Sequence, residues 1–290
     1  MPEIGNKITE TDIDLVDETF ERSQAGSYHL SIQIEPGRLS FCVLNTVLNK
    51  YIVLRNYPLF STDPHALVSE CSCIFENDEL LGLRYKSSSH LWVSPRCTLV
   101  PEHLFDPDNE DSFLEFNHGT TAGEQVLHNY IRPIGLYNLF SYHESLMALL
   151  RIFQPDVKLF HHATPFIESV GMSSLSKTRM AVCFYSKYLD IAVVENSELL
   201  FYNTFQINTP EDSVYYFVGV SNLFKINLLQ IKLIYAGNFK HMPPEVTILK
   251  DYVERIIEQE PSNAVTYSHY ISDTFRKNFI NLFNLYVCGS

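Results

Sequence analysis

Two acidic residues, Glu35 and Asp190, have the chemistry and the setting of a paired site. They lie in two predicted hairpins with closely matching sequence patterns. If the hairpins face each other across a cleft, the carboxylates approach, and paired carboxylates hold Mg²⁺ or act in acid–base catalysis. The competing interpretation is that each is a turn residue in water, because Asp and Glu side chains are mostly exposed.

Other residues that could take part in catalysis or metal binding lack the further ligands or motif residues that a site needs. A metal centre needs three or four converging ligands, and neither His161-His162 nor His143-Glu144 offers a second histidine four residues on. We therefore interpret these histidines as core or surface residues. Ser87-Ser88-Ser89-His90 is interpreted as a turn, because no Gly-x-Ser-x-Gly surrounds it.

An acidic run between Asp106 and Glu115 has the composition of a calcium loop but not its spacing. An EF-hand loop needs glycine at position 6 and a glutamate at position 12. Counted from Asp106, these positions hold Asp111 and Asn117. We expect a solvated loop over residues 102–115, as is usual for charge runs.

Composition limits the classes of partner. The formal net charge of −13 argues against a nucleic-acid surface, which needs clustered Lys and Arg, and against an anionic membrane surface. No stretch approaches the ~20 apolar residues that span a bilayer, and Met1 is not followed by a charged and then apolar leader. The sequence therefore predicts a cytoplasmic protein whose partner is another protein.

The cysteines indicate a reducing compartment rather than a site. No Cys-x-x-Cys occurs, so neither a zinc site nor a redox dithiol is predicted. We expect buried free thiols. The six are Cys42, Cys71, Cys73, Cys97, Cys183 and Cys288.

The elements that must position these residues follow from an internal repeat. Residues 30–44 align without a gap on residues 180–194, with apolar residues at every second position on both sides of a four-residue turn. This pattern predicts two hairpins. A third strand follows each, at residues 51–57 and 199–205.

The repeat continues beyond the strands. Asp63-Pro64 and Thr209-Pro210 predict helix starts, because a capping side chain precedes a proline that lacks an N–H. Further strands are expected at residues 91–95 and 231–236. We place the domain boundary in the small, polar stretch 171–178.

The organisation predicted is an acidic N-terminal arm over residues 1–27, a first lobe over 28–172 and a second lobe over 173–290. The arm is interpreted as loose or as a short docked helix. An inserted strand pair is expected near 124–142. The remaining expectations are extended segments at 80–85 and 157–161, helices at 143–153, 164 onward, 244–258 and 272–287, and a strand at 264–267.

Three antiparallel strands, then helix, strand, helix, strand and helix, occurring twice, resembles the actin-like ATPase superfamily. That resemblance implies an α/β fold with two ribonuclease-H-like lobes, each opened by three antiparallel strands of a mixed sheet. Leu189-Asp190-Ile191-Ala192-Val193 is similar to the Thr-Asp-Ile-Ala-Val ending of the second phosphate loop in bacterial actin homologues. More narrowly, the chain resembles a bacterial family of unknown function with this fold.

The phosphate and adenosine motifs that the resemblance implies are degenerate. The first loop should read Asp-x-Gly-Ser/Thr, and this chain has Glu35-Pro36-Gly37-Arg38. The second should read Asp-x-Gly-Gly-Gly-Thr, and residues 183–188 have neither that acid nor the glycines whose N–H groups wrap phosphates. The adenosine motif keeps one glycine of two, in Ala236-Gly237-Asn238. The vestigial cleft would comprise Glu35, Gly37, Arg38, Ser186, Lys187, Asp190, Gly237 and Asn238.

Two functions of different class follow from this resemblance. The first is a non-catalytic scaffold or protein-binding module that takes no cofactor, with Tyr185 and Tyr188 filling the cleft. The second is an ATP-dependent enzyme or filament protein with divergent loops, in which Arg38 and Lys187 bind an anion and ATP and Mg²⁺ are the cofactors. The loss of the glycines favours the first.

Overall fold

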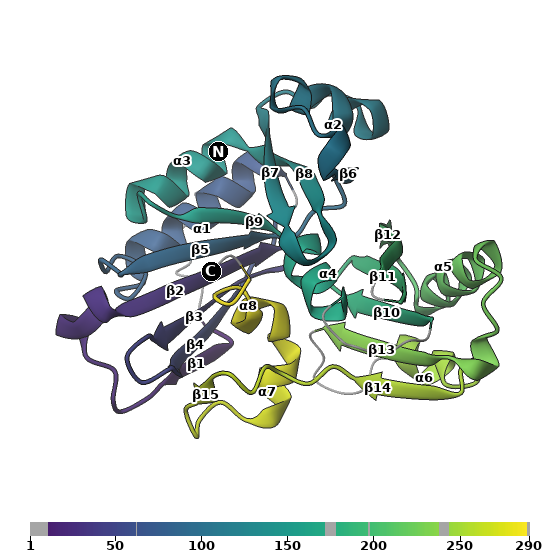
Figure 1. The fold of residues 1–290 in the computed structure, drawn as a ribbon. Coiled ribbons are helices and arrows are strands. Elements are labelled where there is room, and N and C mark those ends of the chain that lie inside the picture. Colours follow the sequence, from purple (N-terminus) through teal and green to yellow (C-terminus); the bar gives the residue numbers. More distant parts are fainter. Residues whose placement is uncertain (1–10, 62, 172–177, 197, 238–243, 289–290) are drawn as a thin grey trace, which may run out of the picture.

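In the computed structural model, which describes residues 11–61, 63–171, 178–196, 198–237 and 244–288, the chain forms two lobes and a smaller projecting subdomain (Figure 1). Each lobe is built on a mixed sheet, and the subdomain on three antiparallel strands. The lobes meet where β2, β5 and β9 of the first point toward β10 and β11 of the second (Figure 1).

The first sheet has the order β1-β4-β3-β2-β5-β9, with β15 added beside β4. The β2–β3 and β3–β4 pairs are antiparallel, whereas β2–β5 and β5–β9 are parallel. The strands are β1 (Ile13–Val16), β2 (Tyr28–Glu35), β3 (Arg38–Asn45), β4 (Lys50–Pro58), β5 (Ser87–Trp92), β9 (Lys158–His161) and β15 (Thr266–Tyr267).

Helices cover both faces of this sheet, which explains why every residue of β2 is buried. On one face Ile32 and Phe41 pack with Phe75 of α1 (Pro64–Asn77) and Leu150 of α3 (Glu144–Phe153). On the other face Cys42 and its neighbours pack against the C-terminal helices α7 (Asp273–Asn278) and α8 (Ile280–Asn284). Because both faces of β2 and β3 pack against helices, the two strands and the turn between them are held rigidly.

The second sheet has the order β12-β11-β10-β13-β14, the same arrangement as β4-β3-β2-β5-β9. The two predicted hairpins are present, with Ile34 opposite Leu39 in one and Phe184 opposite Leu189 in the other. The elements are β10 (Arg179–Phe184), β11 (Tyr188–Glu195), β12 (Glu198–Gln206), α5 (Pro210–Leu223), β13 (Lys232–Gly237), α6 (Pro244–Leu249) and β14 (Arg255–Glu258).

Both helices predicted from a capping residue and proline begin where expected. The Asp63 carboxylate accepts from the Ala66 N–H at 2.9 Å, and Pro64 is the first residue of α1. Thr209 and Asp212 form a capping box at the start of α5, which satisfies two of its free N–H groups.

The projecting subdomain consists of β6 (Cys97–Pro101), β7 (Glu124–Ile131) and β8 (Leu136–His143), in the order β6-β8-β7, with α2 (Glu110–His118) beside them. The strand pair β7–β8 was expected, but the expectation of a loop throughout 102–115 is wrong. Glu110 and Asp111 lie in the first turn of α2, where acid side chains favour the positive end of the helix dipole, and Leu114 is its buried anchor.

Four further expectations differ from the structure. Ser87–His90, interpreted as a turn, opens strand β5, in which Ser88, Ser89 and His90 are buried. Residues 13–16 form a strand antiparallel to β4 rather than a loose or helical arm. The helix expected over 244–258 ends at Leu249, and Arg255–Glu258 is a strand parallel to β13, because its two isoleucines extend the sheet. Residues 80–85 lie in turns and bends rather than in a strand, apart from the irregular Leu83-Arg84-Tyr85 end.

The C-terminal segment lies on the first lobe although it follows the second lobe in sequence. β15 pairs with β4, and α8 contacts β2 and β3. The expected helix over 272–287 is divided at Phe279 into α7 and α8. The expected boundary in 171–178 lies mostly outside the described residues, after α4 (Ala163–Gly171). Short 3₁₀ turns occur at Arg22–Ser27, Glu102–Leu104, Pro107–Asn109, Arg132–Ile134 and Leu228–Gln230.

Candidate functional site

The hairpin turns of the two lobes are in direct contact. Ser186, between β10 and β11, donates its hydroxyl hydrogen to the Pro36 carbonyl, between β2 and β3. Gly37 has a φ of +95°, which favours glycine, and a Cβ there would lie 3.9 Å from Ser186 Oγ. The turns that the superfamily resemblance assigns to phosphate binding therefore bind each other.

Glu35 and Arg38 form an ion pair within the first turn. Both the Arg38 Nε and the Gln33 Nε2 donate to Oε1 of Glu35, the latter at 3.1 Å. The Arg38 guanidinium also lies 5.1 Å from the centre of the Phe279 ring. The positive charge of Arg38 is thus directed at its own lobe rather than offered to an anion.

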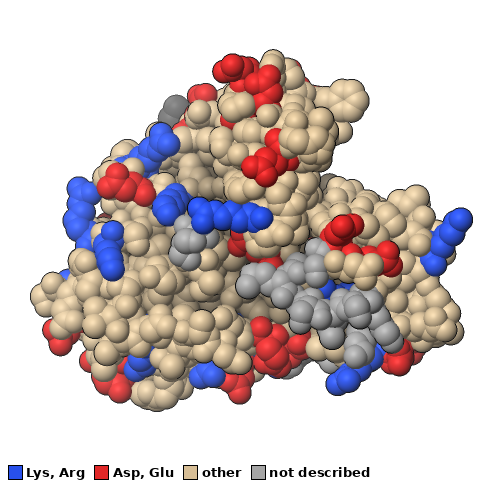
Figure 2. Space-filling model, viewed as in Figure 1, with Lys and Arg blue, Asp and Glu red and all other residues tan. Residues whose placement is uncertain are grey.

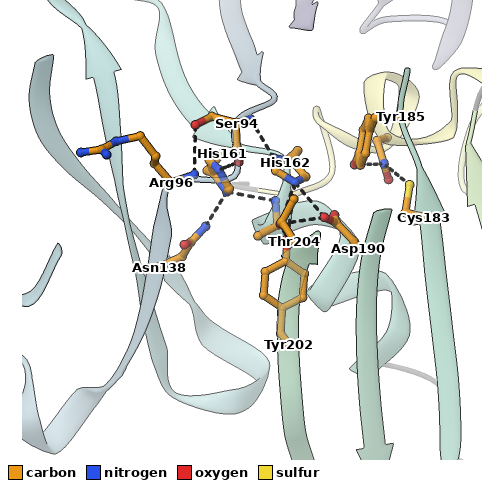
Figure 3. A network of polar contacts seen from close by, with 12 residues as sticks. Ser94, Arg96, Asn138, His161, His162, Cys183, Tyr185, Asp190, Tyr202 and Thr204 are labelled. Carbon is orange, nitrogen blue, oxygen red and sulfur yellow. Dashed lines mark hydrogen bonds and ion pairs between the residues drawn. The ribbon is translucent and has the colours of Figure 1, made fainter. Parts of the chain in front are cut away.

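Asp190 is held by a different set of partners. Its Oδ1 accepts a hydrogen bond from Thr204 Oγ1 at 2.8 Å and lies 3.1 Å from Nε2 of His162 (Figure 3). Both carboxylate and imidazole are fully buried. The hypothesis of a Glu35–Asp190 pair thus gives way to two separate arrangements, because each carboxylate has its own cationic or donor partner.

The tautomer of His162 follows from its other contacts. Its Nδ1 accepts from the Ser94 N–H at 3.4 Å, so Nε2 carries the proton and donates to Asp190. His162 follows β9 of the first lobe, and Asp190 lies on β11 of the second. This hydrogen bond is therefore a buried connection between the lobes.

His161 extends the network into the first lobe. Burial, with neighbouring His162 adding to it, holds the pKa of His161 well below its ordinary value, so the ring is neutral. Its Nε2 donates to the Ser94 carbonyl at 2.8 Å, and its Nδ1 accepts from the Asn138 amide at 3.4 Å. Figure 3 shows the two imidazoles side by side between these partners. These contacts fix the positions of both imidazole rings.

Tyr185 is a third connection between the lobes. The Asn281 amide of α8 donates to the Tyr185 oxygen at 2.8 Å and to the Cys183 sulfur at 3.2 Å. The Tyr185 ring lies 4.8 Å from that of His162. Burial raises the pKa of Tyr185 well above its ordinary value, so the hydroxyl stays protonated.

A cavity of about 300 Å³ lies beside the joined turns. Its apolar wall comes from Leu67 and Val68 of α1, Trp92 of β5, Leu146 of α3 and Tyr188 of β11. Its charged lining is Glu35, Glu124 and Lys187. Of the predicted site residues, the structure brings together Glu35, Gly37, Arg38, Ser186 and Lys187, of which Glu35 and Lys187 line this cavity.

The remaining predicted residues lie elsewhere. Asp190 is in the buried network, and Gly237 is opposite Phe184 at the end of β13, with a φ of +137°. Neither is among the residues that line the cavity. Asn238 lies outside the described residues.

A sequence-family model described as "protein of unknown function (DUF3822)" matches residues 17–256. The chain belongs to this family. No curated protein matches it by sequence. Within the described part of the chain, no helix is long and apolar enough to cross a membrane.

Two solved structures place the family's fold. A Bacteroides thetaiotaomicron protein "with actin-like ATPase fold and unknown function" has a TM-score of 0.81 at 20% identity, covering 93% of this chain and 99% of that one. The "PilM-PilN type IV pilus biogenesis complex" contains a chain with a TM-score of 0.54 at 10% identity, covering 89% and 97%. This member of the family therefore has the actin-like ATPase fold that its sequence resembles.

Candidate metal ligands converge at one place in the described ranges, away from the cavity. Asp17, Glu18 and His269 lie close together. Burial alone would raise the pKa of Asp17, but hydrogen bonds from Lys50, Ser268 and Thr19 lower it below its ordinary range. Lys50 lies 2.8 Å from the Asp17 carboxylate, so this group already has a cation.

Sequence reasoning missed the partners of Asp190. His161 and His162 are buried, as their interpretation as core or surface residues allows, but that interpretation did not predict Asp190 as a partner of His162. The available signal was a pair of histidines at the carboxyl end of a parallel strand, the position where open α/β sheets place functional side chains. Thr204 and Trp92 carried no signal of their own.

Proposed function

We propose that this protein is a non-catalytic binding or scaffold module, which keeps the shell of an actin-like ATPase without its nucleotide site. The observation that carries the proposal is the contact between Ser186 and Pro36. In a nucleotide site these turns would offer backbone N–H groups to phosphate oxygens. Here they are joined, and Pro36 has no N–H to offer.

The charges around the turns support the same conclusion. Arg38 is paired with Glu35 and Asp190 is hydrogen-bonded to His162, so the cation of the first turn and both carboxylates each already have a partner. Lys187 is exposed and forms no ion pair within the described ranges. A single lysine is a point charge, and the glycine-rich backbone that normally accompanies it is missing.

A protein partner is favoured by the surface of the projecting subdomain. Phe116 of α2 is 90% exposed and Leu104 is 58% exposed, and aromatic residues are enriched in protein interfaces. Figure 2 shows a notch between this subdomain and the second lobe on the face drawn. The PilM-PilN structure gives a precedent, because it is a complex of two proteins.

Two further features belong to this proposal. The equal strand order of the two sheets supports an origin by internal duplication.

The cysteines are free, and burial raises the thiol pKa of Cys42, Cys71, Cys97, Cys183 and Cys288. Unreactive, unpaired thiols fit a reducing compartment, and we place the protein in the cytoplasm.

Thermal unfolding with ATP and Mg²⁺ tests the proposal. A ligand at ~100 times its Kd stabilises the folded state by ~2.7 kcal/mol, so binding is easily seen. We expect no shift of the melting temperature at millimolar ATP. A saturable increase that Lys187→Ala and Gly37→Val weaken would overturn the proposal in favour of the ATP-dependent alternative.

A further inference from the structure

The cavity beside the joined turns has the size and lining of a small-ligand site. Its volume of about 300 Å³ is at the lower end of ligand pockets, which range over roughly 300–1,000 Å³. The wall combines aliphatic side chains of two helices with the rings of Trp92 and Tyr188. Such a wall accommodates an apolar stem of a few carbon atoms.

The two carboxylates in the lining, Glu35 and Glu124, each have an oxygen without a hydrogen bond to a described residue. Glu35 is 1% exposed, and its Oε2 makes no hydrogen bond within the described part of the chain. Glu124 has its Oε2 3.2 Å from Arg96 Nε, and its side chain is 21% exposed. A buried acceptor without a donor costs free energy that an entering donor recovers.

These two features together define the chemistry of an occupant. An ammonium group brings three donors and a positive charge, which suit two carboxylates better than any neutral group does. Arg38 and Arg96 each neutralise one of these carboxylates in part. Lys187 contributes a positive charge to the lining, and its side chain is exposed to solvent.

We propose that this cavity binds a primary ammonium group on a short apolar stem, with the ammonium toward Glu35 and Glu124 and the stem against Trp92, Leu67 and Leu146. The chemistry is shared by small alkylamines, a lysine side chain and the amino terminus of a peptide. The site does not depend on the proposed function, because it requires neither a nucleotide nor its absence.

The protein contains its own probe for this site. Trp92 is the one tryptophan of the chain, so intrinsic tryptophan fluorescence comes from a residue that lines this cavity. We would titrate the full chain with n-pentylamine and with n-pentanol, which have the same stem and differ in the charged head. We expect the amine to bind at least about tenfold more tightly than the alcohol, a difference of 1.4 kcal/mol.

Four variants locate the amine. Glu35→Gln and Glu124→Gln should each reduce the preference for amine over alcohol, whereas Val68→Phe should fill the cavity and abolish both signals. Glu198→Gln, at an exposed glutamate of β12, is the matched control and should change neither. Glu35→Gln is assessed only if its urea transition keeps the wild-type slope, and Glu124→Gln carries the test if it does not.

Lys187→Ala gives the sharpest result, because its expected effect on affinity has opposite signs for an amine and for ATP. Removing a like charge from the rim should strengthen amine binding, while removing it from an anion site would weaken ATP. Failure of the amine site and failure of the proposed function are therefore seen separately. Equal affinity for alcohol and amine, or no fluorescence response to either, would overturn the inference.

The source of the ammonium is decided by two further titrations. Leucine amide represents a peptide amino terminus, and N-acetyl-lysine methylamide represents a lysine side chain. Tighter binding of leucine amide would assign the site to a peptide terminus, and tighter binding of the lysine derivative to a side chain. Preference for pentylamine over both would assign it to a small amine.

Discussion

Nε2 of His162 lies 3.1 Å from Oδ1 of Asp190, and this buried hydrogen bond joins the first lobe to the second. The imidazole is fixed by the Ser94 N–H on its other side, and the carboxylate by Thr204. The lobes are thus connected at the base of the cleft by groups that have no contact with water.

Replacing Asp190 should therefore be costly. Asp190→Ala leaves the donors of His162 and Thr204 unsatisfied, and each such group costs about 1–3 kcal/mol. We expect a loss of about 2–5 kcal/mol in the free energy of unfolding by urea. Asp190→Asn should lose less, because its amide oxygen still accepts a hydrogen bond.

Asp108→Ala is the control for Asp190, since Asp108 is exposed on the projecting subdomain. A surface change of this kind usually stays within about 0.5 kcal/mol. If Asp190→Ala were as mild as Asp108→Ala, the connection between the lobes would have no energetic weight.

The Ser186 contact with Pro36 should govern local opening more than global stability. Ser186 is exposed, so Ser186→Ala should cost no more than about 1.5 kcal/mol, the usual range for one hydrogen bond. The expected effect is faster amide hydrogen exchange in the two turns around Gly37 and Lys187, because the lobes separate there more often.

Ser27→Ala provides the matched comparison, because Ser27 Oγ also donates to a carbonyl, that of Gln24, but within its own segment. That variant should leave exchange at Gly37 and Lys187 unchanged. If amide hydrogen exchange is also unchanged in Ser186→Ala, contacts other than this hydrogen bond protect the two turns from exchange.

How far the sequence predicted this arrangement can be argued from the same residues. The hairpins were predictable because alternation in 30–44 and 180–194 reflects burial of alternate side chains, and the register follows from the turn. The His162–Asp190 hydrogen bond is not predictable from the sequence, because it depends on how the two lobes pack against each other. The strand β14 was missed because four residues are too few for a periodicity to be recognised.

Acid should destabilise the protein through its buried histidines. Burial, with the charge of Lys158 adding to it, lowers the pKa of His29 to about 4, and burial lowers that of His90 to about 3. The pKa of His161 is also well below its ordinary value. The unfolded chain binds these protons near pH 6.5, while the folded protein does not.

The sign of the pH dependence follows from these lowered values. The stability is fully present above about pH 6.5 and decreases as the pH falls toward 4, with a limiting slope near 1.4 kcal/mol per pH unit for each histidine. His29→Gln should reduce the pH dependence of the free energy of unfolding between pH 6 and pH 5 by about 1.4 kcal/mol per pH unit, the contribution of one histidine. Urea unfolding across this range measures it, and a stability that is flat down to pH 5 would contradict the prediction.

The C-terminal segment should be essential to the first lobe. Phe283 of α8 is 1% exposed and its ring lies 4.7 Å from that of Tyr51 on β4. Phe283→Ala removes this packing and should cost about 3–5 kcal/mol in the free energy of unfolding. Phe116→Ala, the same substitution at a residue that is 90% exposed, should leave stability nearly unchanged.

The same pair of variants separates folding from binding. If the exposed side of α2 is a contact surface for a protein partner, Phe116→Ala should weaken capture of that partner at unchanged stability, because exposed aromatic residues often anchor interfaces. Phe283→Ala should instead lower the melting temperature of the first lobe. A stable Phe283→Ala variant would mean that residues 266–284 are an accessory to the first sheet rather than the layer that completes it.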